Sequence, residues 1–396
     1  MSIMNIHRRI AILGASGSVG AALAAHILRS RLLEPQDQLL LVGHGVLGTE
    51  RKLLSMRADL MDAFDDDRVR IEVVPNVSDV EADIVVVAAG ATVTSAQTRR
   101  ELGAANRVIF EQIAGQCVSR LSNALFIVVS NPVELAVKIF SIAGDRKRVI
   151  GMGAEQDSLR FARAVAADLA VSRHEVRATV LGEHGGTMIP LWRSVELLTD
   201  DRRAASRLAC LRSRSAESPL EVRVASLRSE VGRHLSKNRI SEAYALTRRA
   251  LPDARIFVEP FITNHGLHST PNATANTTLQ VIEAVVANDH RRIRGQVDLR
   301  GEVLGLYGVC GIPLTIGKNG WQAEALDWLD ANEVRAVKKS TESIEEFISE
   351  TLIDGVRATL SPEELMVLES LTLDELPSIA EAATDDFARH ECGSLN

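Results

Sequence analysis

Residues 10–20 read Ile-Ala-Ile-Leu-Gly-Ala-Ser-Gly-Ser-Val-Gly, an apolar run that enters a glycine-rich turn, and a helical pattern follows as far as Leu28. Glycines permit a tight passage from strand to helix, and the first turn of the helix offers unpaired N–H groups to a phosphate. The spacing is G-x-x-G-x-x-G rather than G-x-G-x-x-G, so the pattern gains its weight from the strand and helix around it. The stretch predicts a dinucleotide-binding loop formed by Gly14, Ser16, Gly17, Ser18, Val19 and Gly20.

Three further apolar runs end in small or polar residues. They cover residues 39–42, 84–88 and 127–129. Apolar runs that alternate with helical patterns predict a parallel sheet covered on both faces. We therefore expect an α/β fold, with a Rossmann-type doubly wound sheet in residues 1–152. The strand ends add these candidate cofactor contacts: Gly43, His44, Ala89, Gly90 and Asn131.

The rest of the chain must form a second unit, since 396 residues exceed the usual size of a single core. We expect an α+β substrate domain over 153–352 and an extension over 353–396. The net charge of −7 argues against a nucleic-acid surface, and no apolar run of about 20 residues predicts a membrane span. The four cysteines form no CxxC pair or Cys/His cluster, so we expect reduced thiols, a cytoplasmic protein and no metal site.

The end of the second strand bears on the choice of nucleotide. A carboxylate at this position usually bonds the adenosine ribose and disfavours a 2′-phosphate. Here the sequence reads Gly43-His44-Gly45, with Arg51 and Lys52 a little further on. The absence of an acid favours NADP or mixed use. The alternative, that backbone or water holds the ribose of NAD, is about equally weighted.

A histidine between glycines stands out in the middle of the chain. Residues 181–187 read Leu-Gly-Glu-His-Gly-Gly-Thr and follow a strand-like run over 176–181. The turn places the imidazole of His184 at a strand end, where it can face a cleft. Histidine can give or take a proton near neutral pH. Taken alone, His184 is equally compatible with a structural imidazole.

Taken together, these segments resemble the malate/lactate dehydrogenase family over roughly residues 8–200 and 270–352. The segments occur in the family's order and at family-like spacing. They are Gly14-Ala-Ser-Gly-Ser-Val-Gly20, Thr98-Arg-Arg-Glu-Leu102, Ser130-Asn-Pro-Val133, Asp157-Ser-Leu-Arg-Phe161, Leu181-Gly-Glu-His-Gly185 and Val309-Cys-Gly-Ile-Pro-Leu-Thr-Ile-Gly317.

The resemblance implies an oxidoreductase that moves a hydride between NAD or NADP and a small 2-hydroxy or 2-oxo acid, in a homo-oligomer (dimer or tetramer). It implies that His184 donates the proton, that Asp157 orients His184 and that Arg160 grips the substrate carboxylate. Arg99, on a closing loop, then polarises the carbonyl, and Asn131 lies near nicotinamide and substrate. Without these companions, Asp157 and Arg160 would read as an ordinary surface ion pair.

The sequence departs from the family at three places. Val93 occupies the substrate-selecting position and cannot pair with a second substrate carboxylate, which favours a substrate with a neutral or apolar side chain. Gly186 replaces an acid behind the histidine. Residues 237–272 look inserted, and we expect them to rebuild a wall of the substrate pocket or to elaborate the surface. A threonine within 270–278 is expected to face the nicotinamide. The alternative function is a nucleotide-binding relative that acts as a sensor or assembly protein without turnover.

Overall fold

The computed structural model describes residues 7–44, 47–64, 69–91, 99–267 and 269–357. Within them, one eleven-stranded sheet has the order β3-β2-β1-β4-β5-β6-β9-β10-β7-β8, with β11 paired to β10. The six strands on the N-terminal side are parallel. Their bounds are β1 (Arg9–Leu13), β2 (Gln38–Val42), β3 (Arg70–Val74), β4 (Ile84–Val87), β5 (Leu125–Val128) and β6 (Val149–Gly151).

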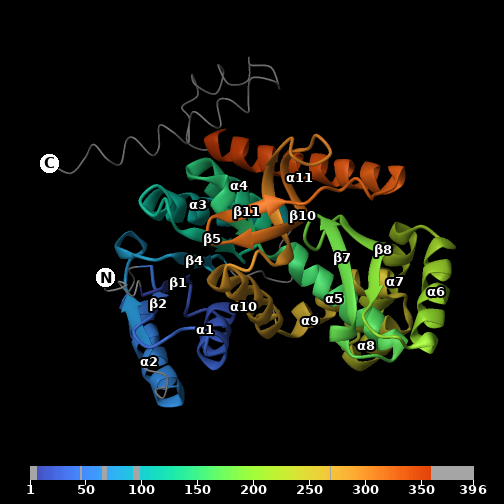
Figure 1. Ribbon diagram of the computed structural model, residues 1–396, viewed down its shortest axis with the longest axis horizontal. Coiled ribbons are helices and arrows are strands. Elements are labelled where there is room, and N and C mark those ends of the chain that lie inside the picture. The colour runs from blue at the N-terminus through green and yellow to red at the C-terminus, as the bar shows by residue number, and fades with distance from the viewer. Residues whose placement is uncertain (1–6, 45–46, 65–68, 92–98, 268, 358–396) are drawn as a thin grey trace.

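Alternate residues of the parallel strands enter two separate cores. In β1, Ile10 and Ile12 face one side, whereas Ala11 and Leu13 face the other. Helices cover both faces, with α1 and α10 on the first and α3, α4 and α11 on the second (Figure 1). Their bounds are α1 (Ser18–Arg29), α3 (Arg99–Cys117), α4 (Val133–Ala143), α10 (Pro271–Ala287) and α11 (Ala331–Arg357). The predicted doubly wound sheet is confirmed.

The C-terminal side of the sheet is antiparallel, as expected for an α+β region. The bounds are β7 (Val176–Gly182), β8 (Met188–Leu197), β9 (Arg292–Arg300), β10 (Tyr307–Gly317) and β11 (Gly320–Ala323). It joins the parallel part where Gly151 of β6 pairs with Gln296 of β9. The sheet therefore runs across the boundary that we placed at residue 152, and the division into domains stays a prediction.

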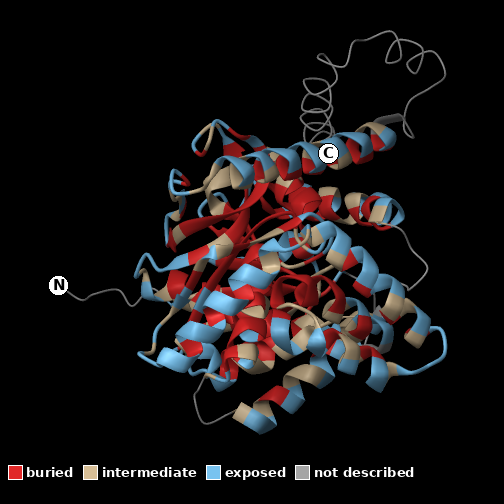
Figure 2. Ribbon diagram, turned by 90° about the vertical axis from the view of Figure 1, so that its right-hand side faces the viewer, coloured by how far each residue is buried: buried red, intermediate tan, exposed pale blue. Residues whose placement is uncertain are grey.

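A third core lies between β7, β8 and a group of helices. The helices are α5 (Gly153–Leu169), α6 (Arg202–Ala216), α7 (Leu220–Leu235), α8 (Ile240–Arg249) and α9 (Pro252–Leu267). Buried residues fill the centre of the molecule, and exposed ones follow the outer faces of the helices (Figure 2). A remaining helix, α2 (Leu47–Phe64), packs along the edge of the parallel part through Leu53 and Leu60.

The segment that looked inserted, 237–272, is not a surface elaboration. It forms α8, α9 and the start of α10, and α9 packs on α5 and α7. Ile256 and Val258 are almost completely buried in the third core. The predicted extension begins inside α11, which continues to Arg357, and residues 358–396 lie outside the described residues. None of the helices in the described part of the chain is long and apolar enough to cross a membrane.

Candidate active site

The glycine-rich turn brings two strand ends together. Gly14 has φ +81°, and a Cβ there would lie 2.8 Å from the carbonyl oxygen of Ala88 and from backbone atoms of Ala89. Gly17 closes the turn by donating its N–H to the carbonyl of Gly14 (3.0 Å) and directly precedes α1. The loop thus brings backbone close to the start of a helix, which is the arrangement that a pyrophosphate requires. The residues present fit a dinucleotide.

The predicted catalytic residues come from two different elements. His184 lies two residues beyond the end of β7, and its Nδ1 is 2.7 Å from Oδ2 of Asp157 on α5. The other carboxylate oxygen of Asp157 accepts from Nη1 of Arg160 at 3.0 Å. Asp157 is 1% exposed, so its charge is compensated inside the protein by these partners. Because Nδ1 faces the carboxylate, Nε2 is the ring atom left for a proton transfer.

Burial and charge compete at this pair. Burial lowers the pKa of His184, but the charge of Asp157 and the hydrogen bond to it outweigh burial, and the pKa of His184 is raised. Burial raises the pKa of Asp157, but the charge and hydrogen bond of His184, followed by those of Arg160, leave the pKa of Asp157 lowered. The charged forms of both side chains are therefore stabilised together, as a proton-donating imidazolium requires.

A buried carboxylate that the sequence did not single out holds the histidine turn. Glu134, in the first turn of α4, is 1% exposed and accepts the backbone N–H of His184 at 2.7 Å. Its second oxygen accepts from Nη2 of Arg99 at 3.1 Å. The guanidinium of Arg99 is also ion-paired with Glu183 and lies 4.5 Å from the ring centre of Phe347. Arg99 is thus tied to the turn that carries His184. Val93 lies outside the described residues.

The unusual Gly186 has a structural reason. The carboxylate of Glu183 turns back and accepts from the backbone N–H (2.8 Å) and the hydroxyl (3.0 Å) of Thr187. A Cβ at Gly186 would collide with that carboxylate. Ser340 of α11 completes the support by accepting the N–H of Glu183 at 3.1 Å. The carboxylate of Glu183 therefore closes the turn, and it fills the space that a side chain at position 186 would need.

A polar cluster beside Arg160 was only partly anticipated. The amide of Gln156, 6% exposed, donates to the hydroxyls of Thr270 (3.0 Å) and Thr274 (3.2 Å), and Arg160 also donates to Thr270 (3.2 Å). These are two of the threonines in the range 270–278. Gln156 carried no sequence signal beyond its position before Asp157, because its partners lie more than 100 residues away.

The strand ends that we expected to meet the cofactor also have polar support. The side-chain amide of Asn106 links the two strand ends. It donates to the backbone carbonyl of Asn131 at 2.6 Å, and its oxygen accepts the backbone N–H of Ala91, next to Gly90. Ser130 donates to the carbonyl of Ala89 at 2.6 Å. The ends of β4 and β5 are thereby fixed side by side. The roles proposed for Asn131, Ala89 and Gly90 stay predictions.

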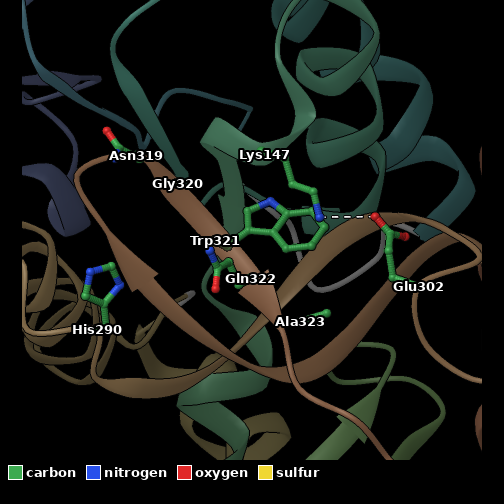
Figure 3. Close-up of a pocket in the computed structure, with 8 residues that line it drawn as sticks. All are labelled: Lys147, His290, Glu302, Asn319, Gly320, Trp321, Gln322 and Ala323. Atoms are coloured by element: carbon green, nitrogen blue, oxygen red, sulfur yellow. Dashed lines mark hydrogen bonds and ion pairs between the residues drawn. The ribbon is translucent and has the colours of Figure 1, made fainter.

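A separate hollow of about 450 Å³ lies at the β10–β11 hairpin (Figure 3). Its lining comprises Lys147, His290, Glu302, Asn319, Gly320, Trp321, Gln322 and Ala323. The ammonium of Lys147 lies 3.6 Å from the ring centre of Trp321 and forms an ion pair with Glu302 at 3.1 Å. The charge of this lysine is already compensated, and the hollow shares no residue with the His184 cluster.

Known proteins resemble both parts of the chain. Residues 8–151 match the family model described as lactate/malate dehydrogenase, NAD binding domain. An L-2-hydroxycarboxylate dehydrogenase (NAD(P)(+)) of Methanocaldococcus jannaschii is 26% identical over 86% of this chain and 98% of its own length. A malate dehydrogenase of Chlorobium phaeobacteroides is 27% identical, over 85% and 96% respectively.

Solved structures agree on the fold. A malate dehydrogenase from Plasmodium falciparum has a TM-score of 0.64 and 21% identity, covering 87% of this chain and 98% of its own. A lactate dehydrogenase from Eimeria maxima with NADH and oxamate has a TM-score of 0.66 and 20% identity, covering 89% and 96%. Residues 8–151 thus match the NAD-binding domain of lactate/malate dehydrogenases, and the chain as a whole is similar in sequence and in fold to malate, lactate and L-2-hydroxycarboxylate dehydrogenases.

Proposed function

We propose that this protein is an NAD(P)-dependent 2-hydroxy acid dehydrogenase. In this proposal His184 transfers the proton, Asp157 orients His184, and Arg160 binds the substrate carboxylate. The observation that carries the proposal is the buried Asp157 carboxylate, which bonds the imidazole of His184 with one oxygen and the guanidinium of Arg160 with the other. The relatives named above are dehydrogenases of small 2-hydroxy acids, which supports this substrate class.

The bound nicotinamide supplies or accepts the hydride. In reduction, protonated His184 gives a proton from Nε2 to the substrate oxygen, and in oxidation the neutral imidazole takes it back. Asp157 keeps the proton on Nδ1 and stabilises the imidazolium. Glu134 fixes the position of the ring by holding the backbone N–H of His184.

Two arginines take the negative charges of the substrate. The planar guanidinium of Arg160 grips the carboxylate through two hydrogen bonds, and each such charged bond contributes roughly 1.5–3 kcal/mol. Arg99 stabilises the oxygen on which negative charge develops during the reaction. Its ion pairs with Glu134 and Glu183 support this role, because they hold the guanidinium beside the histidine turn.

The substrate has a neutral or apolar side chain in this proposal. Val93 stands at the position that selects the side chain in the family, and valine offers no charge to a second carboxylate. Leaving that carboxylate unpaired on burial would be costly. Oxaloacetate is therefore expected to be a poor substrate relative to 2-oxo acids with one carboxylate.

A panel of 2-oxo acids tests the function directly. Purified protein is mixed with NADH or NADPH and each acid in turn, and nucleotide absorbance is followed. Turnover of at least one monocarboxylic 2-oxo acid, lost in His184→Asn, is the expected result. Binding of nucleotide without turnover across the panel would favour the sensor or assembly protein, an alternative that the dehydrogenase relatives do not favour.

We further propose that the protein works in the cytoplasm as a homo-oligomer, a dimer or a tetramer, as the family resemblance implies. The four cysteines form no CxxC pair or Cys/His cluster in the sequence, which supports a compartment that keeps thiols reduced. Light scattering coupled to gel filtration measures the mass in solution, and a 43.0 kDa species at micromolar concentration would contradict the oligomer.

A further inference from the structure

The end of β2 beside the predicted nucleotide loop carries no acid, and the first acid after it is Glu50, in the first turn of α2. β2 ends at Val42, and residues 43–49 contain no aspartate or glutamate. A carboxylate at this strand end binds the ribose hydroxyls of NAD and repels a 2′-phosphate, whereas a basic group accepts one. The groups that surround this strand end therefore decide which nucleotide the protein takes.

Lys52 reaches this position from α2. Its Nζ donates to the carbonyl oxygen of Ser16 at 2.5 Å, so the ammonium lies at the rim of the glycine loop although the two residues are 36 positions apart. The side chain is exposed, and no carboxylate of the described residues forms an ion pair with it. A lysine that bonds only a neutral carbonyl keeps its charge available for an anion.

His44 and Thr49 lie at the end of β2 and in the first turn of α2, the helix that carries Lys52. The exposed imidazole of His44 bonds the hydroxyl of Thr49 through Nε2 at 2.9 Å. Nothing lies within 4 Å of the place where a Cβ of Gly48 would be. The surface at Gly48 is therefore open, and it lies at the start of α2, where helical N–H groups favour negative charge.

We propose that Lys52, His44 and Thr49 bind the 2′-phosphate of NADP, so that this protein prefers NADP to NAD. Lys52 supplies the fixed charge, and Thr49 and the imidazole of His44 supply hydrogen bonds to the phosphate oxygens. The inference rests on the proposed function only in that the protein binds a nicotinamide dinucleotide, and it needs no assumption about the substrate.

The test measures binding, by the fluorescence of the reduced nucleotide, and does not depend on turnover. The wild-type protein is expected to bind NADPH at least about 10-fold more tightly than NADH, since one charged hydrogen bond contributes roughly 1.5–3 kcal/mol. Adenosine 2′,5′-bisphosphate should displace NADPH, whereas adenosine 5′-monophosphate with added inorganic phosphate should not. Equal binding of both nucleotides, or displacement by the phosphate mixture, would overturn the proposal.

Three variants locate the effect. Lys52→Met is expected to weaken NADPH binding by about 10-fold or more and to leave NADH binding within about twofold. His44→Asp should reverse the preference by placing an acid at the strand end. Arg51→Met, a matched exposed cation one residue away, should change neither nucleotide by more than about twofold. An Arg51 effect equal to that of Lys52 would exclude a specific site.

The two proposals fail in different ways. If the protein binds neither nucleotide, both the dehydrogenase and the 2′-phosphate site are wrong. If it binds NADH as well as NADPH and still reduces 2-oxo acids, the proposed function stands and the 2′-phosphate site alone is rejected. Because Lys52 and His44 are exposed, their substitution is expected to leave the melting temperature unchanged, which a thermal scan verifies.

Discussion

The two halves of the sheet differ in the side chains that they bury. In the described residues up to Val128, the buried polar side chains are Asp37 and Asn106 alone, and the rest of the core is apolar. Beyond that point the protein buries many charges, among them Glu134, Asp157, Asp253 and Arg255. The parallel half is held by hydrophobic packing, whereas the half that carries His184 depends on charges that must find partners.

This difference decides what each half tolerates. An apolar strand residue loses packing in proportion to the methyl groups removed. A buried charge that loses its partner keeps the full cost of desolvation. The partners are also far apart in sequence: Arg223 and Asp253 are separated by 30 residues, and Glu134 and His184 by 50. The catalytic half is therefore the more sensitive to single polar substitutions.

The largest effect is expected at the proton donor. His184→Asn should lower kcat by about 10²- to 10⁴-fold, the usual contribution of a positioned acid or base. Nucleotide binding should be retained, because the glycine loop is untouched. Steady-state kinetics with a 2-oxo acid identified in the panel measures the loss. Wild-type turnover in the variant would remove His184 from its proposed role.

The free energy of unfolding of two variants, one in each half, tests the comparison. Asp253 is 2% exposed and accepts two bonds from Arg223 (2.6 and 2.8 Å) and one from Trp192. Asp253→Ala should lower the free energy of unfolding by about 3–5 kcal/mol, because it leaves the guanidinium uncompensated. The matched change in the apolar half, Ile12→Val, should cost about 0.5–1.5 kcal/mol. Urea unfolding measures the loss of stability in each variant. An equal loss in both would contradict the difference between the two halves.

A smaller effect is expected at the carboxylate clamp. Arg160→Lys keeps the charge but loses the planar fork, so KM for the 2-oxo acid should rise about 10- to 100-fold, equivalent to one charged hydrogen bond of roughly 1.5–3 kcal/mol. Nucleotide affinity should stay the same, which separates the clamp from the cofactor site. An unchanged KM would exclude Arg160 from binding the substrate carboxylate.

The smallest expected effect is a shift in the pH dependence of kcat/KM, which tests the role of Asp157. Since the pKa of His184 is raised above the ordinary 6.5, reduction should be constant below the raised pKa and fall as pH rises through it. The stabilising imidazolium–carboxylate pair is lost over the same range. In Asp157→Asn, burial and the charge of Arg160 lower the pKa of His184 and only the weaker effect of Glu134 raises it, so the descending limb of kcat/KM should move to lower pH. A limb that stays in place would contradict the assignment of Asp157.

The sequence predicted the parallel half well, because its signals are local. Four apolar runs, each followed by small residues, were sufficient to predict β1, β2, β4 and β5 and the glycine turn at Gly14. The same local logic placed Asp157 and Arg160 three residues apart on one helix, where the structure shows their ion pair. The catalytic and binding roles of these residues stay predictions that the variants above address.

The sequence could not predict the supports of the site. Each support is a hydrogen bond that folding forms between residues 36 to 118 positions apart. These bonds join Glu134 to the N–H of His184, Gln156 to Thr270 and Thr274, and Lys52 to Ser16. Nor did it show that Gly186 leaves room for the carboxylate of Glu183.

The amino-acid sequence by itself determined the alternation of strands and helices and the side chains that could carry acid–base chemistry. These follow from periodicities of two and 3.6 residues and from the chemistry of single groups. Tertiary structure alone decided which carboxylate compensates which cation and what holds the histidine turn. The physical reason is that a buried charge is stable only beside a partner, and the closing of the whole chain chooses that partner.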